Sequence, residues 1–257
     1  MSFVGRIEQE GVVWLWLDRP QRHNALIPEL VRDLRSSLAW SAAQQPKALV
    51  LTGRGRSFST GGDIAGFIEH AASAEALSSY ANQLVGGLHD AIMDLLKFPA
   101  PVITSVNGPV TGGAAGFVLA ADMVAMSDSA FIQPYYSEVG FAPDGGWTAL
   151  LPERIGTAKA LEIQYLNRQI SAQHAERLGL ANIVRPTFAL EDSIRDWLDD
   201  LTRRSGRTHT ATRSNIWDAD RLTAVKRRLD QEQSRFLDLI TMPETLQGMQ
   251  SFIQRRA

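Results

Sequence analysis

Two glycine pairs and one aspartate could together act on a polarised carbonyl group. The pairs are Gly61-Gly62 and Gly112-Gly113, and Asp144 stands in a Pro-Asp-Gly-Gly run. Glycine lets the backbone approach a ligand closely, and backbone N–H groups stabilise an oxygen that becomes negative during a reaction. A carboxylate near such donors can transfer a proton. Ordinary turn chemistry also explains these residues, so both interpretations stay open at this point.

The stretch 101–146 must position two of these features. An apolar run at 102–106 predicts a strand that ends at Asn107-Gly108, a turn signal. Small apolar residues after Gly113 predict a buried helix over 114–121. A strand, a glycine turn and a helix in this order direct N–H groups and the positive end of a helix at one place. The loop 140–146 then carries Asp144.

Around this stretch the patterns predict an α/β fold with a largely parallel sheet. Residues 3–9 and 12–18 form a predicted hairpin, and further strands are expected at 48–52 and 181–184. Asn24 is the predicted cap of a helix at 27–42, and residues 53–63 form a glycine-rich loop. The other predicted helices cover 74–98, 147–155, 158–166, 191–204 and a short segment capped by Ser171.

The chain divides into a predicted core domain, 1–204, and a C-terminal helical region, 205–257. Residues 205–212 are interpreted as a linker or turn, and the arginine-rich stretch 203–213 as a solvated loop. From residue 215 onward the chain is predicted to be helical, with apolar stripes that pack on a partner subunit or back on the core.

Composition excludes several classes of protein. The net charge is −2 and the isoelectric point about 6.2, which argues against nucleic-acid binding. With no cysteine, disulfides and thiolate chemistry are impossible. No apolar run reaches the ~18 residues that span a bilayer, and no secretory signal is visible. We therefore expect a soluble cytoplasmic protein.

Five sequence runs together resemble the crotonase (enoyl-CoA hydratase/isomerase) superfamily: LDRPQRHNAL, RSFSTGGDI, PVITSVNGPVTGGAAGFVLAADMV, FAPDGGWTALLPERIG and ISAQHAERLGLANIV. The resemblance implies the crotonase (ClpP-like) spiral of ββα units with a C-terminal helical oligomerisation region. It also implies a homotrimer or a dimer of trimers. The implied substrate is an acyl-CoA thioester, so that coenzyme A is part of the substrate. No metal or other cofactor is implied.

The resemblance also assigns roles to residues. It implies that the N–H groups of Gly62 and Gly113 form an oxyanion hole. The implied adenine pocket lies near Ala25 and a loop that comprises Ser59, Thr60, Gly61, Asp63 and Ile64. Tyr135, Tyr136 and Trp147 would line the acyl pocket, and Arg255 or Arg256 would meet a phosphate of coenzyme A from a neighbouring subunit.

Two departures from the family pattern argue against a hydratase. Hydratases of this family activate water with two glutamates. Gly116 stands at the place of the first, and Tyr135 or Tyr136 at the place of the second. None of these residues is a carboxylate base. The chain therefore resembles most closely the isomerase branch, enoyl-CoA isomerases and the ring-epoxide isomerases of phenylacetyl-CoA breakdown, in which an acidic residue in this loop moves the proton.

The predicted function is therefore isomerisation of an enoyl-CoA-type thioester with Asp144 as the proton shuttle. One alternative is a hydrolase or dehalogenase-like enzyme in which Asp144 is a nucleophile or a base and His89 assists. Another is a homologue that binds without catalysis. For His89, the competing interpretation is a surface or interface histidine on a helix. For Asp63, it is a role in shaping its own loop.

Overall fold

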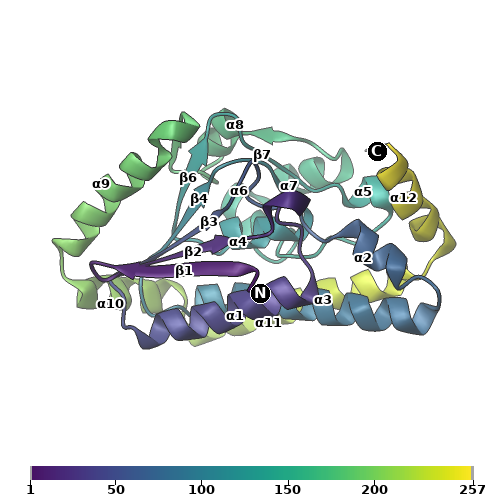
Figure 1. The fold of residues 1–257 in the computed structure, drawn as a ribbon, viewed down its shortest axis with the longest axis horizontal. Coiled ribbons are helices and arrows are strands. Elements are labelled where there is room, and N and C mark those ends of the chain that lie inside the picture. The colour runs from purple at the N-terminus through teal and green to yellow at the C-terminus, as the bar shows by residue number, and fades with distance from the viewer. Residues whose placement is uncertain (1, 256–257) are drawn as a thin grey trace.

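The computed structural model describes residues 2–255, in which two β-sheets are surrounded by helices (Figure 1). A six-stranded sheet has the order β1-β2-β3-β4-β6-β9. Only its β1–β2 pair is antiparallel. The six strands are β1 (Val4–Gln9), β2 (Val12–Leu17), β3 (Ala48–Gly53), β4 (Val102–Val106), β6 (Met123–Ser127) and β9 (Ile183–Arg185). The predicted largely parallel sheet and its N-terminal hairpin are therefore confirmed.

A second sheet of three short strands lies near the glycine turns. Its order is β5-β7-β8, with bounds β5 (Val110–Thr111), β7 (Phe131–Gln133) and β8 (Ile170–Ser171). The helices are α1 (Pro28–Ala43), α2 (Ile64–Glu69), α3 (Ala74–Leu96), α4 (Ala115–Leu119), α5 (Tyr136–Val139), α6 (Leu151–Ile155), α7 (Thr157–Tyr165), α8 (Ala172–Arg177), α9 (Leu190–Thr202), α10 (Gly206–Ile216), α11 (Ala219–Ile240) and α12 (Pro243–Gln254).

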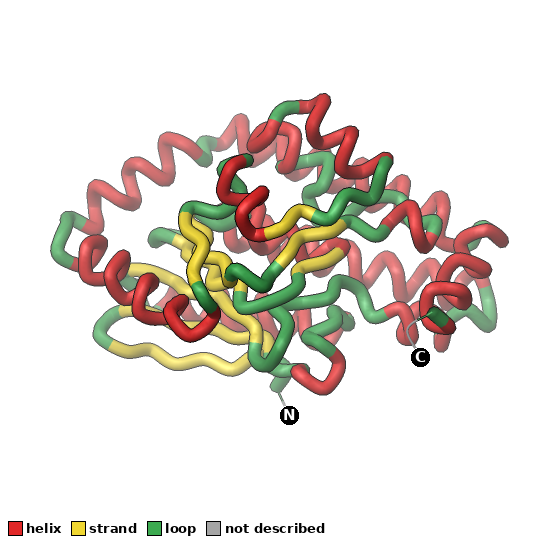
Figure 2. Tube along the Cα trace, turned by 90° about the horizontal axis from the view of Figure 1, so that it is seen from above, coloured by secondary structure: helices red, strands yellow, loops and turns green. Residues whose placement is uncertain are grey.

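Both faces of the large sheet are covered, which explains the continuous apolar sequences of β3 and β4. On one face, α1, α3 and α11 run side by side (Figure 1) and bury the main hydrophobic core. On the other face, α9 buries a smaller core that includes Val50, Ile103 and Ile194. Figure 2 shows the strands gathered together, with helices extending beyond them on the side of the molecule where the C-terminus lies.

The C-terminal helices return to the core of their own chain. The α11 helix packs along α3, and α12 packs against α2 and α5. Residues Val225, Leu229 and Phe236 of α11 are buried in the main core. One of the two predicted destinations of the apolar stripes is thus observed. Among residues 2–255, no helix combines the length and the apolar character needed to cross a membrane.

Several predicted elements need correction. The buried helix after Gly113 is a 3-10 turn, Gly112–Ala114, followed by only five residues of α4. The predicted helix at 147–155 begins at Leu151. Asn24 caps no helix; α1 has Ile27 at its N-cap. Asn24 is instead fully buried beneath the loop 54–58. Its side-chain amide donates to the carbonyl oxygens of residues 54, 57 and 58 of that loop.

The arginine-rich stretch is a helix and not a solvated loop. Residues 206–216 form α10, and its Arg213 is buried. The Arg213 guanidinium donates to the carbonyl oxygens of Leu95, Leu96 and Phe98 at 2.6–2.8 Å, and to Asp122 at 2.8 Å. These carbonyls lie at the C-terminal end of α3, where the regular helical hydrogen bonds end; of the three, the Leu95 oxygen also accepts from the Phe98 N–H at 3.2 Å. Arg213 therefore caps the C-terminal end of α3, although it lies in a distant part of the sequence.

Candidate active site

The predicted oxyanion glycines and Asp144 line one narrow pocket. It encloses about 60 Å³ between the loop after β3, the turn after β5, α5 and the two C-terminal helices. Apart from these residues the walls are mostly apolar, and six of them are aromatic: Phe67, Tyr135, Tyr136, Phe141, Phe236 and Phe252. Phe67, Phe141 and Phe236 form one aromatic cluster, with ring centroids 4.9–5.9 Å apart. A few convergent polar groups in an apolar pocket are typical of a small-molecule site.

Hydrogen bonds between two loops bring the glycine turns together. The Ser59 N–H donates to the Pro109 carbonyl at 3.2 Å, and the Thr111 N–H donates to the Ser59 carbonyl at 3.1 Å. A side chain on Gly61 would place its Cβ 2.6 Å from the Thr111 carbonyl oxygen. Only glycine therefore permits this approach. Turns 51 residues apart in sequence, at Gly62 and Gly113, thus meet at one pocket.

Each candidate donor follows a glycine with left-handed backbone. Gly61 has φ +75° and Gly112 has φ +52°. Within residues 2–255, neither the Gly62 nor the Gly113 N–H group has a hydrogen-bond acceptor. Buried backbone N–H groups are nearly always paired, so the unpaired N–H group of buried Gly113 is exceptional; Gly62 is half-buried. Both N–H groups are free to donate hydrogen bonds to an oxygen atom of a ligand.

Asp144 is buried beside the second turn. A Cβ built on Gly113 would lie 2.8 Å from its Oδ1 atom, so glycine keeps space there for the carboxylate. The Tyr136 hydroxyl donates to Asp144 Oδ1 and, at 3.0 Å, to the Asp144 main-chain oxygen. Burial raises the pKa of Asp144 to about 7; the Tyr136 hydrogen bond opposes that rise, and the nearby Glu232 carboxylate adds to it. A carboxyl group with this pKa can both accept and return a proton near neutral pH.

The two tyrosines at 135–136 make different contacts, and which of them stands at the place of the second glutamate stays a prediction. Burial, foremost, raises the pKa of Tyr136 well above its usual value, so this phenol stays protonated and donates to Asp144. Tyr135 has a left-handed φ of +63°, and its N–H donates to Asn167 Oδ1 at 2.9 Å. Both rings line the pocket, as predicted.

Gly116 leaves no room for the family's first glutamate. A Cβ there would meet Ile92 Cδ1 at 2.3 Å and the Gly145 carbonyl oxygen at 2.5 Å. Real Cβ atoms do not approach other atoms so closely, and the Gly145 oxygen belongs to the backbone. The packing between α3, α4 and the loop of Asp144 thus depends on glycine at this position.

The residues of the predicted adenine pocket occupy different layers. Thr60 and Ile64 line the pocket. Ser59 and Gly61 lie behind it, and the Ser59 hydroxyl donates to the Asn24 carbonyl at 2.7 Å. Ala25 is also buried, and its carbonyl accepts from Arg19 at 3.1 Å. The adenine pocket stays a prediction.

Asp63 shapes its loop, as the competing interpretation proposed. Its carboxylate caps α2 by accepting from the Ala65 N–H at 3.2 Å, and it pairs with Arg19 at 2.7 Å and Arg22 at 3.2 Å. Although burial raises the pKa of Asp63, these two arginines outweigh it and hold the pKa below its usual value. These two ion pairs anchor the segment that precedes α1 to the loop of Gly62.

Trp147 and His89 lie elsewhere than predicted. Trp147 is buried outside the pocket, where its indole N–H donates to the Gly112 carbonyl at 2.8 Å and fixes the second glycine turn. His89 is neither exposed nor part of the pocket wall: only 1% of it is exposed, and its Nε2 atom accepts from the Gly145 N–H at 3.2 Å. Both residues support the loops that carry the candidate groups.

Arg255 is mostly exposed and lies 3.6 Å from Glu138. A contact of Arg255 with a phosphate of coenzyme A stays a prediction. Arg256, the alternative residue, lies outside the described residues.

Sequence reasoning missed the contribution of α11 to the site. Phe236 lines the pocket, and Glu232 accepts hydrogen bonds from the loop after Asp144. A signal was available for Glu232. Glu232 interrupts the apolar stripe formed by Val225, Leu229 and Phe236. A charged side chain on the buried face of a helix needs a specific polar partner, and this was the signal.

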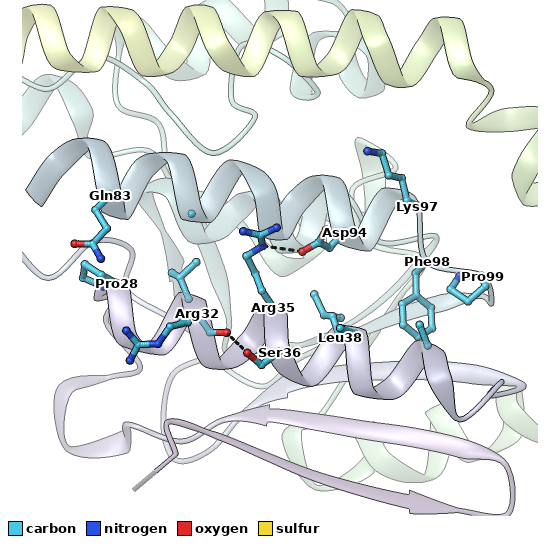
Figure 3. Close-up of a pocket in the computed structure, with 14 residues that line it drawn as sticks. Pro28, Arg32, Arg35, Ser36, Leu38, Gln83, Asp94, Lys97, Phe98 and Pro99 are labelled. Carbon is cyan, nitrogen blue, oxygen red and sulfur yellow. Dashed lines mark hydrogen bonds and ion pairs between the residues drawn. The ribbon is translucent and has the colours of Figure 1, made fainter. Parts of the chain in front are cut away.

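A larger groove between α1 and α3 is separate from this site (Figure 3). It has a volume of about 640 Å³, and none of the predicted site residues lines it. Arg35 crosses the groove and donates to Asp94 at 2.8 Å. The groove therefore offers neither the glycine donors nor the buried acid of the pocket.

Comparison with known proteins places the chain in a family. A model of the enoyl-CoA hydratase/isomerase family matches residues 7–257. A probable enoyl-CoA hydratase of Mycobacterium bovis is 36% identical over 71% of this chain and 65% of its own length. The 1,2-epoxyphenylacetyl-CoA isomerase of Escherichia coli is 32% identical over 70% of this chain and 68% of its own length.

A solved structure supports the same conclusion for the fold. The enoyl-CoA hydratase of Bacillus halodurans superposes with a TM-score of 0.91 over 97% of this chain and 100% of its own, at 19% identity. The chain belongs to the enoyl-CoA hydratase/isomerase family and has the crotonase fold, with a C-terminal helical region. The match spans somewhat less than two thirds of the mycobacterial relative.

Proposed function

We propose that this protein isomerises an acyl-CoA thioester by moving a proton within its acyl group. The N–H groups of Gly62 and Gly113 bind the thioester carbonyl oxygen. The Asp144 carboxylate removes a proton from one carbon, which leaves an enolate whose negative oxygen the two donors stabilise. The protonated Asp144 then returns the proton to another carbon, and the double bond shifts. A single oxyanion donor typically contributes ~3 kcal/mol.

One observation carries this proposal: two unpaired N–H groups and a buried acid with a pKa of about 7 line the same pocket. Family membership and the isomerase relative of Escherichia coli are consistent with it. His89 accepts from the Gly145 backbone and does not line the pocket, so a dehalogenase-like role, in which it would assist at the reacting atoms, is less supported. The predicted trimer or hexamer and the cytoplasmic location stay predictions.

Isomerisation without hydration is the expected result with enoyl-CoA substrates. By resemblance to the family, Gly116 and either Tyr135 or Tyr136 stand at the places of the two water-holding glutamates, and a Cβ at Gly116 would have no space. The assay follows a panel of thioesters in D₂O, beginning with 3-butenoyl-CoA because the pocket is small, by NMR and chromatography. We expect deuterium in the α or γ carbon and a shifted double bond. Hydration of crotonyl-CoA at ~10 s⁻¹ or above, a turnover typical of enzymes, would contradict the proposal.

The variant Tyr136→Phe is expected to move the pH profile to higher pH. A general base works as the carboxylate, so kcat/KM should rise with pH through the pKa of Asp144, about 7. The Tyr136 hydroxyl stabilises that carboxylate, and its removal raises the pKa further. The measurement is kcat/KM for 3-butenoyl-CoA between pH 5 and 9. Tyr135→Phe is the control, since Tyr135 lines the same pocket. A Tyr136→Phe profile that coincides with the wild type would refute this role.

A further inference from the structure

Glu232 of α11 holds the loop that follows Asp144. Only 3% of this residue is exposed. Its Oε2 atom accepts from the Gly146 N–H at 2.8 Å, and Oε1 accepts from the N–H groups of Thr148 at 2.7 Å and Ala149 at 2.9 Å. The Thr148 hydroxyl donates to Oε1 as well, at 2.7 Å. All four partners donate, which is the pattern that an ionised carboxylate requires.

His89 of α3 completes this support from the other side. Its Nε2 atom accepts from the Gly145 N–H at 3.2 Å and lies 3.6 Å from Glu232 Oε2. Burial lowers the pKa of His89 to about 4; Asp230 opposes the shift and Lys226 adds to it. The ring is therefore neutral at pH 7 and carries its proton on Nδ1.

Gly145 and Gly146 both have left-handed φ angles, +64° and +87°. Two helices that are far apart in the sequence thus bind consecutive N–H groups of a turn that glycine makes flexible. Asp144 is the residue directly before that turn.

We propose that Glu232 and His89 are positioning residues that fix Asp144 beside the oxyanion glycines. This inference rests on the proposed role of Asp144 in proton transfer. The side chains that act on Asp144 are Tyr136 from α5 and Glu232 from α11, whereas neutral His89 from α3 contacts the Gly145 N–H and Glu232. Lys226 and Asp230 lie on α11 and act on His89.

The charge of Glu232 predicts a direction. A negative charge nearby disfavours the carboxylate form of Asp144 and contributes to its raised pKa. The variant Glu232→Gln removes this charge, so Asp144 should titrate at lower pH. The amide nitrogen of glutamine cannot accept from a backbone N–H, which loosens the turn as well. His89→Leu also frees the turn, but removes no charge at pH 7.

The experiment combines two readouts on the full chain. Carbon-13 NMR of aspartate-labelled protein follows the titration of Asp144 without any substrate, with Asp144→Asn identifying its signal. Kinetics with 3-butenoyl-CoA and binding of butyryl-CoA separate turnover from affinity. In Glu232→Gln we expect titration at lower pH, kcat reduced by about tenfold to a hundredfold, and butyryl-CoA affinity within about threefold, because a misplacement of ~1 Å costs up to ~10²-fold in rate. In His89→Leu we expect reduced kcat without the titration shift.

Glu153→Gln is the matched control. Glu153 is a carboxylate that also faces α11, where it pairs with Arg221 and Arg228, but it makes no contact with the loop of Asp144 among the described residues. This variant should leave titration and kcat unchanged. The inference is overturned if Glu232→Gln keeps the wild-type titration and kcat, or if kcat and affinity fall together with thermal stability. If Asp144→Asn remains active, the proposed function fails, whereas the NMR titration still tests the influence of Glu232 on Asp144.

Discussion

The variant Asp144→Asn is expected to keep its fold and its affinity for butyryl-CoA and to lose isomerisation by about 10²-fold or more, the range for removal of a positioned acid/base. Asparagine is nearly isosteric with aspartate, and its oxygen can still accept from the Tyr136 hydroxyl. It cannot accept and return a proton at neutral pH. Solvent deuterium exchange should fall with the isomerisation rate, which the same NMR assay measures.

Glu138→Gln is the control for this variant. Glu138 lies on the same short helix as Tyr136 and pairs with Arg255, and it does not line the pocket. Its substitution should change the rate by less than about twofold. An Asp144→Asn protein within a few fold of wild-type activity would show that Asp144 is only a turn residue. A covalent acyl adduct or an aryl ester on Asp144, detected by mass spectrometry after rapid quench of the wild type, would favour the nucleophilic alternative.

A second large effect is expected on stability. The variant Arg213→Met should lower the free energy of unfolding by about 3–5 kcal/mol, the cost of removing one partner of a buried ion pair. The guanidinium is only 8% exposed and serves three carbonyl oxygens of the α3 terminus as well as Asp122. Methionine fills a similar volume but removes the donor that the Leu96 and Phe98 carbonyl oxygens share. The Leu95 oxygen and Asp122 keep backbone donors, the N–H groups of Phe98 and Val102. Urea unfolding monitored by circular dichroism measures the change.

Arg203→Met provides the comparison within the same arginine-rich stretch. Arg203 is 72% exposed and pairs with Asp200 at 3.2 Å. An exposed pair of this kind contributes ~0–1 kcal/mol, so this variant should stay close to wild type. Equal stabilities of the two variants would contradict the role assigned to Arg213. Since Arg213 ends α3, on which His89 lies, a confirmed effect would connect the C-terminal region to the support of the site.

Local patterns were sufficient for most elements of the fold. The strands β2, β3 and β4 are short apolar runs, and Glu10 and Gly11 have the positive φ angles of a hairpin turn. Helices α1 and α3 have apolar residues at helical spacing. These signals depend on neighbours within a few residues, which is why they can be recognised in the chain alone. The glycine pairs were recognised for the same reason, because the need for a left-handed φ is local.

The tertiary structure decided which polar groups meet. Glu232 lies 83–86 residues from its partners in the loop of Asp144, and Arg213 lies 115–118 residues from the carbonyls it closes. Only the tertiary structure shows that Tyr136, and not Tyr135, donates to Asp144, while the Tyr135 N–H donates to Asn167. Periodicity reports which face of an element is apolar, but the partner of a buried charge depends on how distant elements pack. The sequence by itself therefore determined the elements and the candidate donors and acid, whereas packing between α3, α11 and the loops determined how that acid is held and how readily it ionises.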